Sequence, residues 1–100
     1  MEKQKTQYRQ GDLLIETVGS IPADAVPHPK SKSILLAHGE ATGHHHTLEL
    51  DDPADWWKLG EEKIVKVATV ARITHQEHRT ILLPAGTYKV RRQREYTPEA

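Results

Sequence analysis

Residues that favour turns recur about every ten positions along this chain, and the apolar runs between them are short. No window of useful length shows apolar residues at helical spacing. This pattern is typical of small all-β barrels and sandwiches. We therefore expect residues 9–100 to form a small single-domain barrel or sandwich, preceded by a polar N-terminal segment at residues 1–8.

The expected elements follow from composition and from the turn residues. We expect strands at 13–18, 33–38, 44–50 and 61–74, and a hairpin of 79–83 with 87–94 around Pro84-Ala85-Gly86. Residues 21–32 contain three prolines, which predict a loop or an irregular edge. Asp52 followed by Pro53 predicts one short helical turn over 52–58, because Asp is a good N-cap and Pro suits the first helical position.

Composition excludes several classes of function. The chain has 14 basic and 14 acidic residues, so no overall field draws it to nucleic acid or to a membrane. It has no cysteine, which rules out disulfides, thiolate-bound zinc and thiol nucleophiles. No apolar run could span a membrane, and the polar N-terminus does not resemble a signal peptide. We expect a cytoplasmic protein.

Three consecutive histidines at 44–46 are the strongest indication of function. Side chains alternate along a strand, so His44 and His46 share a face with Leu48 and Leu50, which are natural core residues. Two inward imidazoles need a partner to justify their burial. A metal ion is the commonest partner.

Other histidines extend this site. A hairpin of 33–38 with 44–50 would place His38 roughly opposite His44, with Leu36 opposite His46. His75 ends strand 61–74 on its more apolar face, and His78 follows three residues later. The predicted metal ligands are His38, His44, His46 and His75, with water completing the shell of zinc or a similar divalent ion. No organic cofactor is expected.

The same residues suit a reaction without metal. His44, His46 and His75 can serve as general acid and base beside a bound phosphate, as in a phosphodiesterase or nuclease. The hydroxyl of Thr42 and the charges of Arg92 and Arg94 can bind that anion. The sequence does not separate a metal-dependent hydrolase of a small phosphorylated or polar ligand from this metal-independent enzyme, or from a non-enzymatic protein-interaction module.

The C-terminal region is basic, with Lys89, Arg91, Arg92 and Arg94 within six residues. Such a strand can follow a phosphate backbone. In a chain without net charge, a charged edge strand that resists aggregation explains it better. We therefore favour a small or phosphorylated ligand over nucleic acid, expect no membrane contact, and leave open an association of identical chains. Trp56 and Trp57 are adjacent, so only one can face the core fully.

Two resemblances rest on particular motifs. The chain resembles small uncharacterised bacterial and phage proteins that share Gln10-Gly11-Asp12, a Gly-Glu-x-Thr-Gly-His segment (39–44) and Arg-Glu-Tyr-Thr-Pro-Glu (94–99). That resemblance implies no activity. His44-x-His46 with Glu49, and later Pro84-x-Gly86, is similar to the cupin motifs, which implies a small β-barrel with a histidine-lined mouth. Glu49 faces away from His46, and no histidine follows Gly86, so the ligand set stays open.

Overall fold

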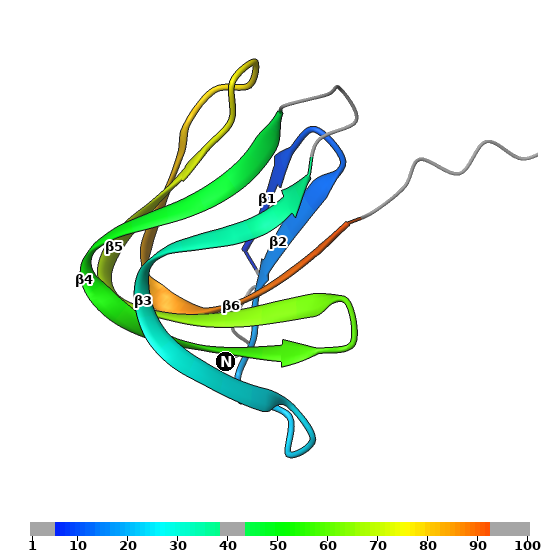
Figure 1. Ribbon diagram of the computed structural model, residues 1–100, viewed down its shortest axis with the longest axis vertical. Helices are drawn as coiled ribbons and strands as arrows, with labels where there is room; N and C mark the ends of the chain where they lie inside the picture. The colour runs from blue at the N-terminus through cyan, green and yellow to red at the C-terminus, as the bar shows by residue number, and fades with distance from the viewer. Residues whose placement is uncertain (1–5, 39–43, 93–100) are drawn as a thin grey trace, which may run out of the picture.

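The computed structural model describes residues 6–38 and 44–92, which form one antiparallel sheet of six strands (Figure 1). The strands are β1 (Gln7–Gln10), β2 (Leu13–Thr17), β3 (Val26–His38), β4 (His45–Leu59), β5 (Glu62–Thr74) and β6 (Ile81–Arg92). Their order across the sheet is β1-β2-β6-β5-β4-β3, so β1 and β3 are the edges. The all-β prediction is confirmed, in the form of a curled sheet that is not closed into a barrel.

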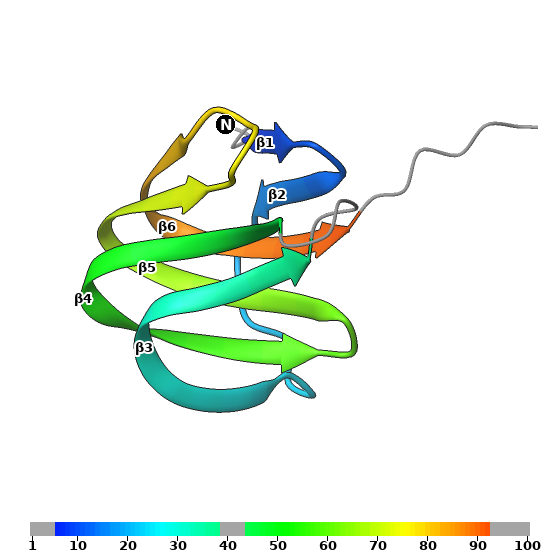
Figure 2. The same cartoon turned by 45° about the horizontal axis from the view of Figure 1, so that its top comes forward.

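The curl of the sheet creates the core. The long strands β3, β4, β5 and β6 bend, so that the two halves of the sheet face each other (Figures 1 and 2). Register shifts interrupt the β3–β4 and β5–β6 pairings, and such bulges increase local bending and twist. The buried apolar side chains between the two halves include Leu13, Ile15, Ile34, Leu48, Val65, Val67, Ala71, Ile73, Leu83 and Val90.

The helical turn expected at 52–58 is wrong, because this segment is the second half of β4. Trp56 and Trp57 pair with β5 on one side and with β3 on the other. Pairing on both sides satisfies more backbone groups than a single helical turn can. Pro53 has no partner in the register of either neighbour, so its missing N–H costs no ladder hydrogen bond. Of the two tryptophans, Trp56 packs against the core.

The hairpin expected around Pro84-Ala85-Gly86 is also wrong. The segment lies inside β6, where Pro84 is opposite Val70 and Gly86 is opposite Val67, with a bulge between them. The Tyr88 side chain covers Gly86, and its hydroxyl donates a hydrogen bond to the Pro84 carbonyl at 2.7 Å. These contacts favour an extended chain over a turn.

The edges of the sheet confirm one prediction from the sequence and contradict another. The prolines at 27 and 29 lie in β3, an edge strand, which confirms the irregular edge predicted for 21–32. The basic strand β6 lies between β2 and β5, so its interpretation as a charged edge is wrong. Among the described residues, no helix is long and apolar enough to span a membrane.

The turn between β1 and β2 consists of Gly11 and Asp12. Gly11 has a φ of 60°, a value that favours glycine, and glycine is common at the first position of two-residue hairpin turns. β1 begins at Gln7, so the end of the segment 1–8, expected to precede the domain, belongs to the sheet. This turn places Asp12 beside His46.

Candidate functional site

Four histidines gather at one end of the curled sheet, and we call them the histidine cluster. Its members are His44, His46, His75 and His78. Three ring-centroid distances define it: 4.4 Å from His46 to His75, 4.6 Å from His75 to His78, and 6.2 Å from His46 to His78. The ring of His44 lies 5.6 Å from that of His75. The cluster therefore joins the start of β4 to the β5–β6 connection.

His46 is the buried member of the cluster. It is 1% exposed, as is Leu48 two residues later, and Leu50 is buried as well. The inward orientation that strand alternation predicts for His46 is therefore confirmed. A buried imidazole needs partners for both of its nitrogens.

Gln10 fixes the protonation of the His46 ring. The Gln10 side-chain amide nitrogen donates to the carbonyls of Ile73 at 3.0 Å and Arg79 at 2.7 Å, which leaves its oxygen toward His46. That oxygen lies 2.8 Å from Nδ1 of His46. Because an amide oxygen can only accept, Nδ1 carries the proton, and the lone pair of the neutral ring is on Nε2.

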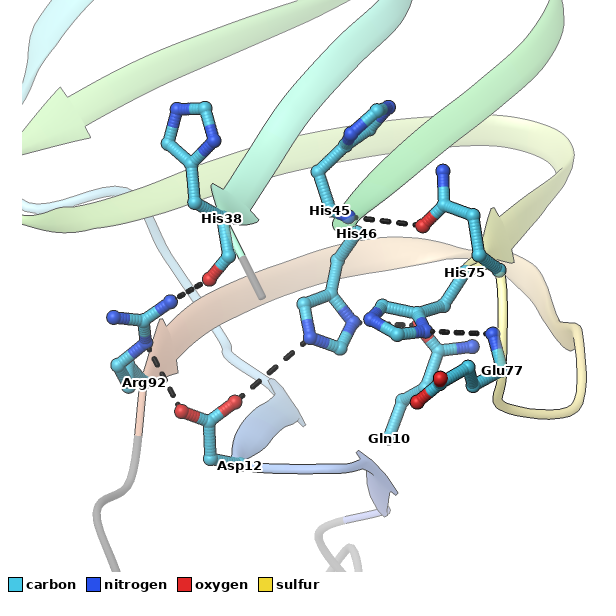
Figure 3. Close-up of polar contacts among 9 residues, drawn as sticks. Gln10, Asp12, His38, His45, His46, His75, Glu77 and Arg92 are labelled. Carbon is cyan, nitrogen blue, oxygen red and sulfur yellow. Dashed lines mark hydrogen bonds and ion pairs between the residues drawn. The ribbon is translucent and has the colours of Figure 1, made fainter. Parts of the chain in front are cut away.

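Asp12 faces the other nitrogen of His46 (Figure 3). Its Oδ1 is 3.8 Å from Nε2, which is longer than a hydrogen bond. Desolvation by burial, with a contribution from the nearby His75, lowers the pKa of His46 from 6.5 to about 4. At neutral pH the ring is therefore uncharged, and a lone pair faces a carboxylate oxygen with no proton between them. Two electron-pair donors in this arrangement suit a cation.

Arg92 holds the second oxygen of Asp12. Its Nε lies 3.1 Å from Oδ2 of Asp12, and its terminal nitrogen donates to the backbone carbonyl of His38. Figure 3 shows the resulting row of groups, from His46 through Asp12 and Arg92 to the end of β3. One oxygen of Asp12 is thus paired with the Arg92 guanidinium, while the other faces the neutral His46 imidazole.

His75 is held differently from His46. The backbone N–H of Glu77 donates to Nδ1 of His75 at 3.0 Å, so the proton of the neutral ring is on Nε2. Desolvation lowers the pKa of His75, and the neighbouring His78 and His44 lower it further. His78 lies over the β1–β2 turn, because a Cβ on Gly11 would be 2.9 Å from its Nε2.

His38 lies apart from the cluster. It pairs with His45 and not with His44 as expected, since a bulge between Leu35 and Ala37 shifts the register. Directly paired residues share a face of the sheet, so His38 and His45 lie on the face opposite His46 (Figure 3). Among the other predicted site residues, Thr42 and Arg94 lie outside the described residues.

A metal ion would require some movement of the cluster. Within residues 6–38 and 44–92, no three His, Asp or Glu side chains already stand as a ligand set. Three imidazoles bound to one zinc ion have ring centroids about 5 Å apart, from the usual Zn–N distance and tetrahedral angle. The separations within the cluster, from 4.4 to 6.2 Å, bracket that value.

The cations of β6 have acidic partners inside the molecule. Lys89 lies 3.9 Å from Glu62, and Arg91 lies 3.8 Å from Glu16. Arg92 is paired with Asp12 as described above. The basic run therefore contributes local ion pairs across the sheet, and Arg92 alone of these three connects to the cluster.

Sequence reasoning missed Gln10 and Asp12 as parts of the site. The sequence identifies them only as part of the motif Gln10-Gly11-Asp12, because their contacts lie more than thirty positions away along the chain. His78 had a weak signal, its position three residues after His75. Gln10 had none, since only the pairing of β1 with the rest of the sheet brings it to His46.

The fold and the site together define a small all-β protein with a buried histidine at the end of a curled sheet. Residues 9–93 match the family model described as Domain of unknown function (DUF8820), and the chain belongs to that family. The matched region includes Gln10, Asp12, Arg92 and the whole histidine cluster. No curated protein and no solved structure matches the chain.

Proposed function

We propose that this protein binds a divalent first-row metal ion, such as zinc, between His46 and Asp12. The observation that carries the proposal is the His46 ring, whose proton is fixed on Nδ1 while its lone pair faces the Asp12 carboxylate. Nε2 of His46 and Oδ1 of Asp12 would be the first two ligands. Further ligands would come from the rest of the histidine cluster and from water.

The surroundings of His46 are those of a metal-binding histidine. Such histidines usually donate their second ring N–H to a carbonyl or carboxylate, which fixes the tautomer and the ring orientation. The Gln10 oxygen accepts this hydrogen bond, and two backbone carbonyls hold Gln10 in turn. Metal binding also requires a neutral imidazole, and burial keeps the pKa of His46 near 4.

The remaining ligands must turn toward the ion. His44 is part-exposed and His78 is exposed, so either side chain can change rotamer without disturbing the core. His75 would have to release the Glu77 N–H before its Nδ1 could bind. A site completed by one or two histidines and water is open, and an open site can activate water for hydrolysis of a small phosphorylated or polar ligand.

Charge favours a cation over an anion at this position. His46 is neutral at neutral pH, and the guanidinium of Arg92, which lies beside the site, is already paired with Asp12. The metal-independent phosphodiesterase has less support for a related reason. A base with a pKa near 4 removes protons poorly at neutral pH.

Zinc titration tests the proposal. Protein purified without a nickel column should bind one zinc ion per chain in competition with a chromophoric chelator. His46→Gln and Asp12→Asn should each lose stoichiometric binding. His45→Gln is the matched control, because His45 is adjacent in sequence and lies on the opposite face. Equal zinc binding by His45→Gln, His46→Gln and the wild type would overturn the assignment.

Hydrolysis needs a separate assay. Cleavage of model phosphate esters that stops with chelator and returns with added zinc would support a metal hydrolase. Cleavage that survives excess chelator and fails in His46→Gln would instead support the metal-independent enzyme. A chain that binds zinc and cleaves none of these esters would be a metal-binding module.

A further inference from the structure

A pocket of about 520 Å³ has Arg92 in its wall. It forms where the end of β3, the turn between β4 and β5, and the end of β6 come together. Leu36 and Leu59 give it apolar lining, Arg91 and Arg92 give it positive charge, and Glu61 and Glu62 give it negative charge. These groups suit a small polar ligand that carries both an anionic group and hydrogen-bond donors.

The pocket lies where β3 contacts β5 and β6 through side chains, and not through backbone pairing of strands. The Leu36 carbonyl accepts a hydrogen bond from Lys63 at 3.1 Å, and the His38 carbonyl accepts one from Arg92. Lys63 belongs to β5 and Arg92 to β6, neither of which is a ladder neighbour of β3. At this place two cationic side chains therefore connect β3 to β5 and β6.

Arg92 belongs to both the pocket and the proposed metal site. Its Nε holds Oδ2 of Asp12 at 3.1 Å, while the same residue lines the pocket. A guanidinium has more N–H donors than its contacts with Asp12 and the His38 carbonyl use, and it binds carboxylate and phosphate groups in a fork. An anion in the pocket can therefore reach Arg92 without entering the site of the metal.

We propose that the pocket binds a small ligand through a carboxylate or phosphate group recognised by Arg92, and that this ligand and the metal ion bind cooperatively. The cooperativity rests on the proposed function. The positive charge of Arg92 opposes a cation between His46 and Asp12, and it neutralises the carboxylate that would bind that cation. An anion on Arg92 offsets this charge, so the Asp12 carboxylate attracts the metal ion more strongly. Linkage then requires the metal to strengthen anion binding by the same factor.

The test measures zinc affinity by chelator competition, at constant ionic strength, with chloride, sulfate or acetate as the anion. Sulfate serves as the probe for a phosphate group, and acetate for a carboxylate. We expect one of these anions to tighten zinc binding to the wild type. Arg92→Gln should bind zinc on the order of tenfold more tightly in chloride and should no longer respond to the anion.

Arg72→Gln is the matched control for net charge, because Arg72 is ion-paired with Asp51 and does not line the pocket. It should bind zinc and respond to anions as the wild type does. Zinc affinity that is unchanged or weaker in Arg92→Gln, or insensitive to both anions in the wild type, would overturn the cooperativity while the proposed metal site stands. A wild type that binds no zinc would overturn the proposed metal site and, with it, the cooperativity.

A second measurement follows the anion directly. In metal-free protein, the side-chain Nε–H resonance of Arg92 should shift on titration with the effective anion, and Asp12→Asn should retain that shift while losing zinc. An unmoved Arg92 resonance with both sulfate and acetate would overturn the pocket as an anion site, whatever the zinc result.

Discussion

His46 links the stability of the protein to pH. In the folded, metal-free protein its pKa is about 4, against 6.5 for the unperturbed group. Between these two values the unfolded chain binds more protons than the folded one, so the free energy of unfolding rises with pH. This contribution is fully present above pH 6.5 and decreases as the pH falls toward 4.

We predict that the wild type loses about 3 kcal/mol of stability through this residue on acidification across that range, a size set by the pKa difference. Urea denaturation with chelator present, over a series of pH values, measures the loss. His46→Gln should lack this part of the pH dependence while retaining the part due to His75, whose pKa is also lowered. Parallel pH profiles for the two proteins would contradict the assignment.

Two glycines with the same backbone conformation allow a controlled test of the role of His78 in the histidine cluster. Gly11 and Gly60 have φ values of 60° and 62°, so alanine at either position costs about 1 kcal/mol of backbone strain. Only at Gly11 would the new Cβ meet a neighbour, at 2.9 Å from Nε2 of His78. We predict that Gly11→Ala displaces His78 and weakens zinc binding severalfold, while Gly60→Ala binds zinc as the wild type does. Chelator competition and thermal unfolding of both variants measure the two effects.

At the scale of elements, local sequence patterns predict several strands and which face of β4 is buried. Composition and turn residues predict strands at 13–18 and 61–74, and the structure has them at Leu13–Thr17 and Glu62–Thr74. Strand alternation predicts that His46 shares the buried face of Leu48, as it does. The failures at 52–58 and 84–86 share one cause. Asp-Pro and Pro-x-Gly are also compatible with bent or bulged strands, and long-range pairing with β3 and β5 decides between the alternatives.

The site was predictable only in part for the same reason. The alternation rule identified His46, but a bulge in β3 moved His38 to the other face, and no local signal marks that bulge. Gln10 and Asp12 join the site because β2 pairs with β6 at the end of the chain. A pairing over that distance leaves no trace in the local sequence around the turn.

Gln10 connects the β1–β2 hairpin to the β5–β6 connection. Replacing it with leucine would leave the Ile73 and Arg79 carbonyls and Nδ1 of His46 without this partner. We predict that Gln10→Leu lowers the free energy of unfolding by about 3 kcal/mol, since unsatisfied buried polar groups cost roughly 1–3 kcal/mol each. Gln7→Leu is the control, because Gln7 bonds to Glu16 at the surface, and it should change stability by less than about 0.5 kcal/mol. Urea denaturation compares the two.

For the whole molecule, the curl of the sheet sets both the core and the site. The two halves of the curled sheet (Figure 2) bury apolar residues of β2, β3, β4, β5 and β6 between them. The histidine cluster lies at one end of that core, where β4 begins and β5 ends. Hydrogen bonds from the side chains of Lys63 and Arg92 to backbone carbonyls of β3 connect this edge strand to β5 and β6. The proposed metal site and the pocket therefore both result from a sheet that curls without closing into a barrel.

The contacts of Gln10 also carry a consequence for folding kinetics. They join residues 63 and 69 positions apart, and chain closure over such distances is entropically expensive before other contacts exist. We infer that the site assembles after the transition state, once the local β4–β5 and β5–β6 pairings are in place. Gln10→Leu should then leave the refolding rate unchanged and place its whole destabilisation in faster unfolding. Stopped-flow chevron analysis measures both rates, and a refolding rate that falls in proportion to the lost stability would show that the site forms early.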